Sequence, residues 1–375
     1  MVENKIPVLF IVDCLYEDAG GGSEKQFLKI HKERESIGID PQIIFLREND
    51  VHQRINWERS PTHVRLDSLF SGKVWKVIRK IEEVIREEKI AIVQSLFDDS
   101  SLVTAIIKAR NPSIRFVCTQ RNLGHSRGWL RRWIFRHVYR RADVVLANSF
   151  GIESVLRDQY AVPIEKIRVI DNMHDVPTLG SCERRAGSAN AVQSIAPLIG
   201  VVVANLRPVK GVEEMIEACR RLPETSKIKM IVAGEGPERI SYVNKTKEWG
   251  LLDRIEFIGY CADIPRLLER VDFAVLPSRA EGASNSLIEY LLAGLPVVAT
   301  RVGGNSEFLG HGKYGLLIEP ESPRALCDGL IEIEKSIEKW RKAAADGREA
   351  AIKRFSTATV ASQYRRFYNS LIHME

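Results

Sequence analysis

Short apolar runs alternate with amphipathic segments along nearly the whole chain, and the alternation starts afresh near its middle. Apolar runs of strand length, each followed by a helical pattern, are typical of βαβ units that build a parallel sheet. The expected strands are Ile6–Val12, Gln42–Leu46, Ile90–Ser95, Arg115–Thr119, Val144–Ala147 and Ile167–Ile170 in the first half, and Ile199–Ala204, Lys229–Ala233, Ile255–Ile258, Phe273–Leu276, Val297–Thr300 and Gly315–Ile318 in the second. The expected helices include Glu24–Ser36, Lys73–Glu88, Leu102–Ala109, Leu130–Arg141, Gly151–Gln159 and a terminal helix, Thr357–Ile372. The pattern predicts an α/β fold with two parallel sheets.

A segment rich in Gly, Ser, Ala and Pro separates the two halves at residues 178–198. A chain of 375 residues is also long for a single hydrophobic core. We therefore predict two domains, 1–177 and 199–356, joined by a linker and followed by a terminal segment, 357–375. Because ligands of open α/β sheets lie outside the carboxyl ends of the strands, we expect the active site in the cleft between the two domains.

The composition fits a globular protein in water, with 45% hydrophobic residues, 28% charged residues and a net charge of +6. The six cysteines, at positions 14, 118, 182, 219, 261 and 327, form no C-x-x-C pair, which argues against a zinc site or a disulfide framework. The apolar run Ile6–Val12 is too short for a signal peptide, and no run is long enough to cross a membrane. We expect a cytoplasmic protein that at most lies peripherally on the inner face of the plasma membrane. Its basic charge is concentrated locally, so no nucleic-acid partner is expected.

The most informative segment is residues 281–300, where two carboxylates stand eight residues apart around a small polar turn that opens a helix. Ser284 or Asn285 can cap this helix. The first backbone N–H groups of a helix attract phosphate, and those expected to do so belong to Ala283, Ser284, Asn285 and Ser286. Glu281 and Glu289 cannot bind an anion and are better placed to hold hydroxyl groups on either side of it. A diphosphate between a ribose and a transferable sugar fits this pattern; the competing interpretation is a capped surface helix with two solvated glutamates.

Three further loops follow expected strands and suit the binding of an anion. Arg207 and Lys210 lie in the first loop of the second half, where both cations can reach phosphate oxygens. Glycines in the other two loops let the backbone approach a ligand closely. These glycines are Gly21 and Gly22 after the first strand, and Gly234 and Gly236 after Lys229–Ala233. The alternative for each loop is an ordinary solvated turn.

Together these segments resemble the retaining glycosyltransferases of family 4, which have the GT-B fold. Glu281-Gly-Ala-Ser-Asn-Ser-Leu-Ile-Glu289 matches the E-x7-E signature of that family, and the match continues through Gly-Leu-Pro-Val-Val-Ala-Thr and the Gly303-Gly304 turn. The resemblance covers nearly all of the second half and, more loosely, the first. It implies two Rossmann-like domains facing each other across a cleft, with the terminal helix returning to the first domain. The first domain, 1–177, is expected to bind the acceptor, and the second, 199–356, the nucleotide sugar.

The resemblance also implies a role for each charged residue. Glu289 is expected to hold the ribose hydroxyls. Glu281 is expected to contact the hydroxyls of the donor sugar and to stabilise positive charge at its anomeric carbon. Arg207, Lys210 and the N–H groups of residues 283–286 are expected to neutralise the leaving diphosphate.

The nucleotide itself is expected to contact mainly backbone. By resemblance, the turn with Gly234 and Gly236 lines the nucleotide pocket, and Tyr260 and Ile264 belong to the loop that holds the base. A base recognised through backbone cannot be identified from side chains, so uridine and guanosine both stay open. The sequence has no Asp-x-Asp pair, so we expect neither a metal nor a cofactor besides the nucleoside-diphosphate sugar, which is a co-substrate.

The chain departs from the family pattern at two places. Asn205 stands where an arginine is usual, and Arg207, two residues later, is the expected substitute. Many family members end the strand near residue 119 with a histidine that approaches the transferred sugar. Arg121 or Gln120 occupies that region here; Arg121 is expected to be catalytic, with His125 as the alternative.

Residues 127–141 combine tryptophan with arginine, which suits the headgroup region of an anionic membrane. The residues expected to form an apolar stripe are Trp129, Leu130, Trp133, Ile134 and Val138, and those expected on its flank are Arg131, Arg132, Phe135, Arg136 and Tyr139. In the competing interpretation this stripe packs on the sheet and the arginines are merely solvated.

The expected function is the transfer of a sugar from a UDP- or GDP-sugar, with retention of the anomeric configuration and without a metal. The basic aromatic segment favours a lipid-linked or polysaccharide glycan acceptor in bacterial cell-surface polysaccharide biosynthesis. A sugar-nucleotide epimerase of the same fold and a non-catalytic sugar-nucleotide-binding protein are the alternatives. A dinucleotide-dependent oxidoreductase is disfavoured, since no Gly-x-Gly-x-x-Gly follows the first strand of either half.

Overall fold

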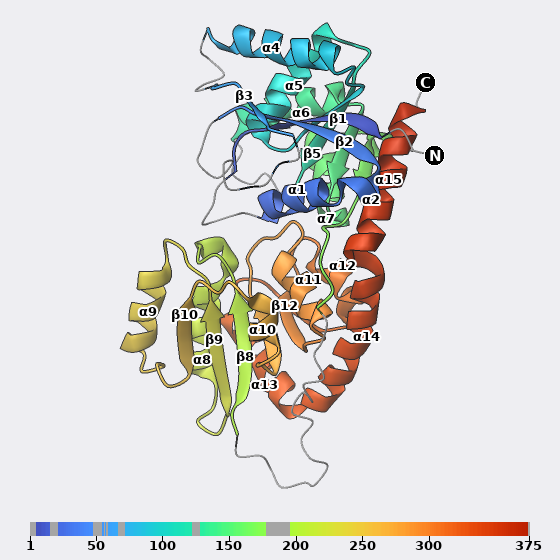
Figure 1. Ribbon diagram of the computed structural model, residues 1–375. Coiled ribbons are helices and arrows are strands. Elements are labelled where there is room, and N and C mark those ends of the chain that lie inside the picture. Colours follow the sequence, from blue (N-terminus) through green and yellow to red (C-terminus); the bar gives the residue numbers. More distant parts are fainter. Residues whose placement is uncertain are drawn as a thin grey trace. The chain divides into compact units, whose positions relative to one another are not determined.

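The computed structural model describes residues 5–15, 22–47, 55, 57, 59–66, 72–121, 128–177 and 196–373. The chain divides into two compact units (Figure 1): unit 1 contains Met1–Met173 and Thr357–Glu375, and unit 2 contains His174–Ser356. The terminal segment 357–375 thus belongs to the same unit as the first half of the chain. Among the predicted features, Gly21, His125 and most of the linker lie outside the described residues.

Unit 1 is built on a parallel sheet with the spatial order β3-β2-β1-β4-β5-β6-β7. The strands are β1 (Ile6–Val12), β2 (Ile39–Phe45), β3 (Thr62–His63), β4 (Ile92–Ser95), β5 (Arg115–Gln120), β6 (Val144–Ala147) and β7 (Ile167–Val169). β2 starts before the expected strand and includes Pro41. Proline has no N–H to donate, but it is tolerated here because β3 pairs only with the last two residues of β2. Leu46 donates its N–H to β1, and backbone N–H groups alternate along a strand, so the nitrogen of Pro41 faces the side that β3 leaves open.

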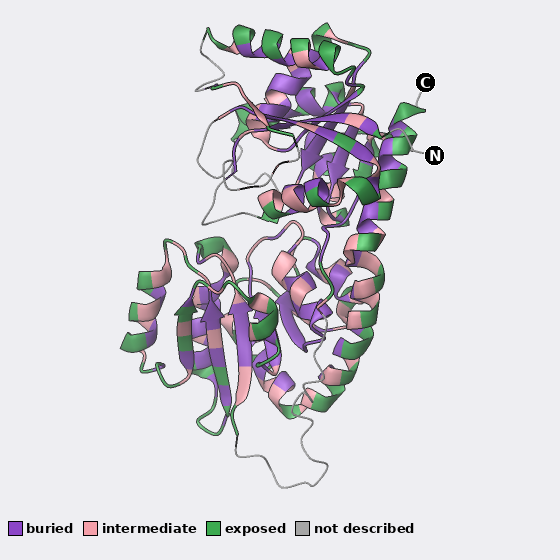
Figure 2. Ribbon diagram, in the orientation of Figure 1, coloured by how far each residue is buried: buried purple, intermediate pink, exposed green. Residues whose placement is uncertain are grey.

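Helices cover both faces of this sheet, which is why its strands are buried along nearly their whole length (Figure 2). They are α1 (Gly22–Lys32), α2 (Arg34–Ile37), α4 (Val74–Glu87), α5 (Asp98–Arg110), α6 (Trp129–Arg141), α7 (Phe150–Tyr160) and α15 (Thr357–Ile372). The terminal helix α15 lies beside α2 (Figure 1) and shares one core with β1, in which Tyr364 and Tyr368 pack near Phe10 and Phe27.

Helix α6 buries a different face from the one that its sequence predicted. Phe135, Val138 and Tyr139 are buried against β5 and β6, whereas Trp129 and Trp133 are exposed. The prediction that Phe135 and Tyr139 lie on the flank of the stripe is therefore wrong. Both faces of this helix are aromatic. The inward one also satisfies its polar group, because the Tyr139 hydroxyl donates to Gln120 Oε1 at 2.7 Å.

Unit 2 has a second parallel sheet, in the order β10-β9-β8-β11-β12-β13. Its strands are β8 (Leu198–Val203), β9 (Ile228–Ala233), β10 (Ile255–Gly259), β11 (Phe273–Leu276), β12 (Val297–Thr300) and β13 (Leu316–Ile318). Its helices are α8 (Val212–Arg221), α9 (Arg239–Glu248), α10 (Ile264–Leu268), α11 (Asn285–Leu292), α12 (Asn305–Phe308), α13 (Pro323–Lys335) and α14 (Ile337–Phe355), with short 3₁₀ turns at Pro208–Lys210 and Gly310–Gly312. Separate apolar clusters fill the two faces of the sheet.

Each sheet reverses its strand order at one place. In unit 1, β2 and β3 are added on one side of β1, and β4 and the later strands on its other side. In unit 2, β9 and β10 are likewise added on one side of β8, and β11 and the later strands on its other side. The loops that leave the carboxyl ends of the two central strands diverge there, so each sheet has a switch point where a ligand can enter. The fold class predicted from the sequence, α/β with two Rossmann-like sheets, is confirmed.

Candidate functional site

Two loops meet at the switch point of unit 2, one after β8 and the other after β11. Gly211 has φ +65°, and a Cβ built on it would lie 1.9 Å from the carbonyl oxygen of Pro277, so only glycine lets the two backbones pass this closely. The Arg279 backbone N–H donates to Val209 O at 2.8 Å, and its side chain donates to Glu214 Oε1 at 2.5 Å. The hydrogen bond that Arg279 donates to Glu214 raises the pKa of the Arg279 guanidinium. These contacts hold the two loops together.

The charged centre of this site is the pair Lys210 and Glu281, one from each loop. Lys210 Nζ lies 2.7 Å from Glu281 Oε1, and Ser278 Oγ donates to the same oxygen at 2.7 Å. The Glu281 side chain is only 8% exposed, so an ionised carboxylate needs these partners. Because both donors converge on Oε1, they leave Oε2 to accept a hydrogen bond from a ligand.

Helix α11 starts beside this pair and is fixed to the end of β8. Ser284 caps the helix by accepting the N–H of Leu287 at 3.3 Å. Ser286 Oγ donates to the carbonyl of Val203 at 2.8 Å, and the N–H of Val203 donates to the Tyr290 hydroxyl at 2.7 Å. Full burial raises the pKa of Tyr290, which keeps its hydroxyl neutral. The start of the helix, with its first N–H groups, is thereby held at the switch point.

Glu289 lies on α11, half-buried, and the helical repeat places it on the same face as Asn285 and Ser286. Ala283 is half-buried in the turn just before the helix. Of the two glutamates of the E-x7-E pattern, Glu281 therefore lies in the loop before α11 and Glu289 on the helix itself.

The loop after β9 approaches the loop after β8 through backbone alone. A Cβ on Gly234, at φ +139°, would lie 1.9 Å from Ala204 O, and one on Gly236 would lie 2.6 Å from the backbone of Leu206. The N–H of Gly234 also donates to Gly259 O at 2.7 Å. The glycines predicted to approach a nucleotide thus bring three neighbouring strand ends together. Beyond β10, the Tyr260 side chain is 72% exposed and the half-buried Ile264 opens α10.

The turn after β12 supports the Glu281 loop from behind. Gly303 has φ +51°, and a Cβ on it would lie 1.7 Å from the carbonyl oxygen of Glu281. Gly304 donates its N–H to Gly282 O at 3.0 Å, and Thr300 Oγ1 donates to Ser278 O at 2.6 Å. The Gly303-Gly304 turn therefore fixes the carboxylate rather than adding a group of its own.

The remaining predicted residues of the site differ in their surroundings. Arg207 is exposed at the start of the Pro208–Lys210 turn, and its side chain contacts no partner among the described residues. Arg121, in unit 1, donates to Asn172 Oδ1 at 2.7 Å and to the Tyr364 hydroxyl at 3.1 Å, so it braces the end of β5 against α15. Gly22 is exposed at the start of α1. The expected contacts of Arg121 and Gly22 with a ligand stay predictions.

The switch point of unit 1 holds a polar cluster that the sequence did not reveal. Asp13, directly after β1, accepts the N–H of Ser100 at 2.7 Å and that of Asp99 at 3.2 Å, at the start of α5. Arg47, after β2, forms an ion pair with Asp99, and Arg131 of α6 lies 3.2 Å from Asp98. Burial raises the pKa of Asp13 to about 6; the hydrogen bond from the Ser100 backbone opposes this shift, and the charge of Asp99 adds to it.

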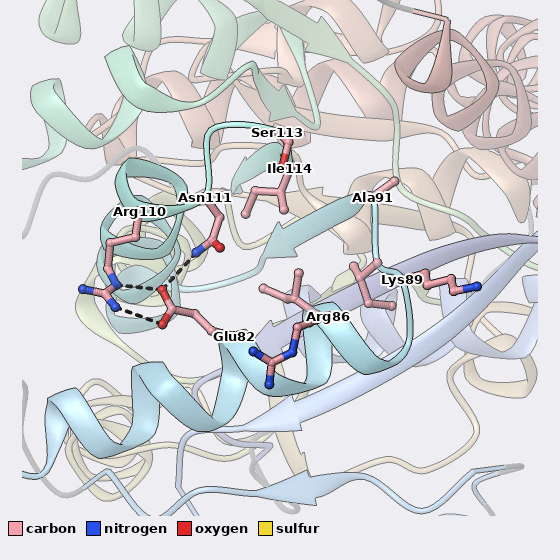
Figure 3. A pocket seen from close by; sticks show the side chains of 10 residues that line it. Glu82, Arg86, Lys89, Ala91, Arg110, Asn111, Ser113 and Ile114 are labelled. Atoms are coloured by element: carbon pink, nitrogen blue, oxygen red, sulfur yellow. Dashed lines mark hydrogen bonds and ion pairs between the residues drawn. The ribbon is translucent and has the colours of Figure 1, made fainter.

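An open pocket of about 870 Å³ lies elsewhere in unit 1, on the amino side of β4 and β5 (Figure 3). Arg110 and Asn111 both donate to Glu82 there, while the Arg86 and Lys89 side chains project from the end of α4. Because this pocket lies at the edge of the sheet opposite to its switch point, it does not belong to the candidate site.

Within the described ranges, no three His, Cys, Asp or Glu side chains are grouped so that they could hold a metal ion. No described helix is long and apolar enough to span a membrane.

Both halves of the chain match models of known protein families. Residues 195–350 match the model described as Glycosyl transferases group 1, and residues 20–176 match Glycosyltransferase Family 4. The N-acetyl-alpha-D-glucosaminyl L-malate synthase of Bacillus anthracis is 29% identical over 170 residues, which are 45% of this chain and 45% of that protein. The chain therefore spans about half the length of that relative.

A second relative matches over more of the chain. The N-acetylgalactosamine-N,N'-diacetylbacillosaminyl-diphospho-undecaprenol 4-alpha-N-acetylgalactosaminyltransferase of Campylobacter jejuni is 24% identical over 279 residues, 74% of this chain and 72% of that protein. Among solved structures, the Anabaena protein HepE in complex with UDP aligns with a TM-score of 0.80 at 20% identity, over 97% of this chain and 100% of that one. Sucrose-phosphate synthase from Thermosynechococcus elongatus aligns with a TM-score of 0.81 at 18% identity, over 98% and 100% of the two chains. These structures share the fold of this chain.

Proposed function

The chain belongs to the family 4 glycosyltransferases of GT-B fold, and from that premise we propose that it transfers a sugar from a nucleoside-diphosphate sugar to a glycan or lipid-linked acceptor. The observation that carries this proposal is the Lys210–Glu281 pair at the start of α11. It puts a cation, a carboxylate and helix N–H groups at one switch point, which are the groups that a sugar diphosphate needs.

In this proposal the donor replaces contacts that the residues of the site make with one another. The donor sugar's hydroxyls take up the free oxygen of Glu281, and Lys210 turns from the carboxylate toward the diphosphate. Arg207, exposed and without a partner among the described residues, closes on the same phosphates. Glu289, on the far side of the helix start, accepts the ribose hydroxyls.

Bond cleavage in this arrangement is assisted by charge. As the bond between the anomeric carbon and the phosphate oxygen breaks, negative charge grows on the diphosphate and positive charge on the sugar ring. Lys210, Arg207 and the first N–H groups of α11 stabilise the former, and the Glu281 carboxylate stabilises the latter. The acceptor oxygen forms the new bond on the face of the sugar that the diphosphate leaves, and its proton passes to the departing phosphate oxygen, so the products are the glycoside and a nucleoside diphosphate. We propose retention of configuration and independence of metal ions on this basis.

Two kinds of relative support the choice of substrates. HepE was solved with UDP and with UDP-glucose, which makes a UDP-sugar the first donor to try, with GDP-sugars second. The C. jejuni relative is named for a diphospho-undecaprenol acceptor, which favours a lipid-linked glycan and a place in bacterial surface polysaccharide assembly. Such a reaction would take place on the cytoplasmic side of the membrane.

The test is a transfer assay with radiolabelled UDP- and GDP-sugars and a bacterial lipid extract as the source of acceptor. We expect label to enter the butanol phase with one donor, in excess EDTA as well as without it, and the anomeric proton coupling of the product to match that of the donor. Lys210→Ala should lower the rate about a hundredfold or more. Conversion of the sugar within the nucleotide would instead identify an epimerase, and donor binding without any product would identify a binding protein.

A further inference from the structure

We propose that the outer surface of α6, formed by Trp129, Leu130, Trp133, Arg132, Arg136 and Arg140, docks on a bilayer that contains anionic lipids. This inference adds a partner to the proposed function. Only the benefit of docking, which is access to a lipid-linked acceptor, rests on that function.

The apolar part of this surface is large and exposed to solvent. Trp129 is 82% exposed, Trp133 58% and Leu130 53%, and all three belong to the first turns of one helix. The same helix already buries Phe135, Val138 and Tyr139, so its need for core contacts is met. Proteins that stay in solution rarely expose adjacent large apolar side chains, and tryptophan beside arginine is typical of the headgroup layer.

Arginines continue the outward face of the helix beyond the tryptophans. With 3.6 residues per turn, Trp129, Trp133, Arg136 and Arg140 project in nearly the same direction, opposite to the buried side chains. All three arginines of the outer surface are exposed, and none of them has an ion-pair partner in the described ranges. The helix sequence contains no Asp or Glu.

The acids that pack near this helix are already compensated. Arg131 faces Asp98 at 3.2 Å and Asp99 at 4.0 Å, and Arg47 also pairs with Asp99. Arg131 therefore attaches α6 to the start of α5 and is not part of the outer surface. What remains facing solvent is cationic and apolar, which is complementary to an anionic headgroup layer.

The alternatives fit this surface less well. A second copy of the chain would bring two arginine-rich helices face to face and set like charges against one another. A nucleic acid would meet two exposed tryptophans over the first turns of the helix, whereas binding along its backbone needs cations to neutralise the phosphates there. A bilayer accepts both, because indole rings enter the interface and arginines remain with the headgroups.

The position of the surface suits the acceptor binding that is expected of the first domain. The start of α6 lies next to the start of α5, where Asp13 marks the switch point of the first sheet. Docking through α6 would therefore bring the sheet edge that is expected to receive a lipid-linked acceptor close to the headgroups.

Vesicle flotation tests this inference with the whole chain and without any donor. The wild type should float with equimolar phosphatidylglycerol and phosphatidylcholine, and much less with phosphatidylcholine alone. Replacing Trp129 and Trp133 together by alanine should lower the partition coefficient about tenfold or more. Replacing Arg132, Arg136 and Arg140 by alanine should abolish the preference for phosphatidylglycerol.

Matched controls come from helix α4 of the same unit. Trp75→Ala removes a tryptophan of similar exposure (55%), and alanine at Lys76, Arg79 and Arg86 removes the same charge. Both controls should float like the wild type. Equal flotation of the Trp129/Trp133 variant, an equal loss in the controls, or a dimer in solution that this variant abolishes would overturn the proposal. UDP binding, measured in parallel without vesicles, separates this outcome from a failure of the proposed function.

Discussion

At the residue scale, the buried carboxyl groups at the two switch points, Glu281 and Asp13, differ in their hydrogen-bond partners. Glu281 is buried but receives both a lysine and a hydroxyl, so its charge is compensated inside unit 2. Asp13 is also enclosed; it accepts the backbone N–H groups of Ser100 and Asp99 and lies near the charge of Asp99. Burial without a hydrogen-bonded cation among the described residues raises the pKa of the Asp13 carboxyl above its usual range.

The pKa of Asp13 predicts how stability depends on pH. Its folded value of about 6 lies above the ordinary 3.8, so between these values the folded state binds more protons than the unfolded state. The free energy of unfolding should therefore fall as pH rises through this window, by about 3 kcal/mol from this group. Urea unfolding at several pH values should show that Asp13→Asn removes this decline, whereas Asp40→Asn, at an exposed position, leaves it in place. Parallel pH profiles for Asp13→Asn and the wild type would contradict the assignment.

At the element scale, α11 is positioned by its attachment to β8 and not by its cap alone. Ser284, expected as a cap from local sequence, does cap the helix. The hydrogen bond between Tyr290 and Val203 could not be expected, because it joins residues 87 positions apart and a tyrosine in this helix is typical of a core residue. In the same way, the buried face of α6 could not be chosen from two similar aromatic faces. A helix cap could therefore be predicted from the local sequence, whereas the tertiary contacts of α11 and α6 could not.

Removing the Tyr290 hydroxyl tests this attachment. Tyr290→Phe leaves the N–H of Val203 without its acceptor, which should lower the free energy of unfolding by roughly 1–3 kcal/mol and weaken nucleotide binding because the start of α11 is released. Tyr242→Phe is the control, since no described residue hydrogen-bonds to the Tyr242 hydroxyl. Urea melts and nucleotide titration should separate the two variants. If they behave alike, α11 is held by packing alone.

Two glycines with the same backbone conformation test the contact between the loops. Gly211 (φ +65°) lies against Pro277, whereas Gly250 (φ +68°) has open space around it. Alanine costs roughly 1 kcal/mol at each position because of the left-handed backbone. Only Gly211→Ala also forces the loops apart and separates Lys210 from Glu281, so it alone should lose donor binding. Donor titration and thermal melting of both variants provide the measurement, and retained binding in Gly211→Ala would show that the contact is not needed.

At the scale of the whole molecule, the order of the chain differs from the order of the units. The last helix, α15, completes unit 1 although it follows unit 2 in sequence. The sequence predicted the helix itself from its aromatic spacing, and its return to the first half came from resemblance. The division into two sheets was readable because buried parallel strands are continuous apolar runs. The polar cluster around Asp13 was not, since it assembles residues separated by more than 80 positions.

Truncation after Ser356 should therefore damage unit 1. The six buried side chains of α15 are Val360, Ala361, Tyr364, Phe367, Tyr368 and Leu371. Their loss from the core amounts to on the order of 10 kcal/mol, comparable with the whole stability of a domain. Limited proteolysis should degrade residues 1–173 and spare unit 2, whereas truncation after His373 should change nothing. A protected first half in the shorter chain would contradict this role of α15.

The central claim is that the switch point of unit 2 binds a nucleoside-diphosphate sugar through Lys210 and Glu281. Calorimetric titration of the whole chain with UDP-glucose, GDP-mannose and their free diphosphates measures this most directly, with Lys353→Ala as a control at an exposed lysine of α14. We predict that the wild type and the control bind one nucleotide equally and that Lys210→Ala binds it about tenfold or more weakly, as expected when a charge-assisted contact to phosphate is lost. Failure of the wild type to bind any of these ligands, or equal affinity in Lys210→Ala, would contradict the account.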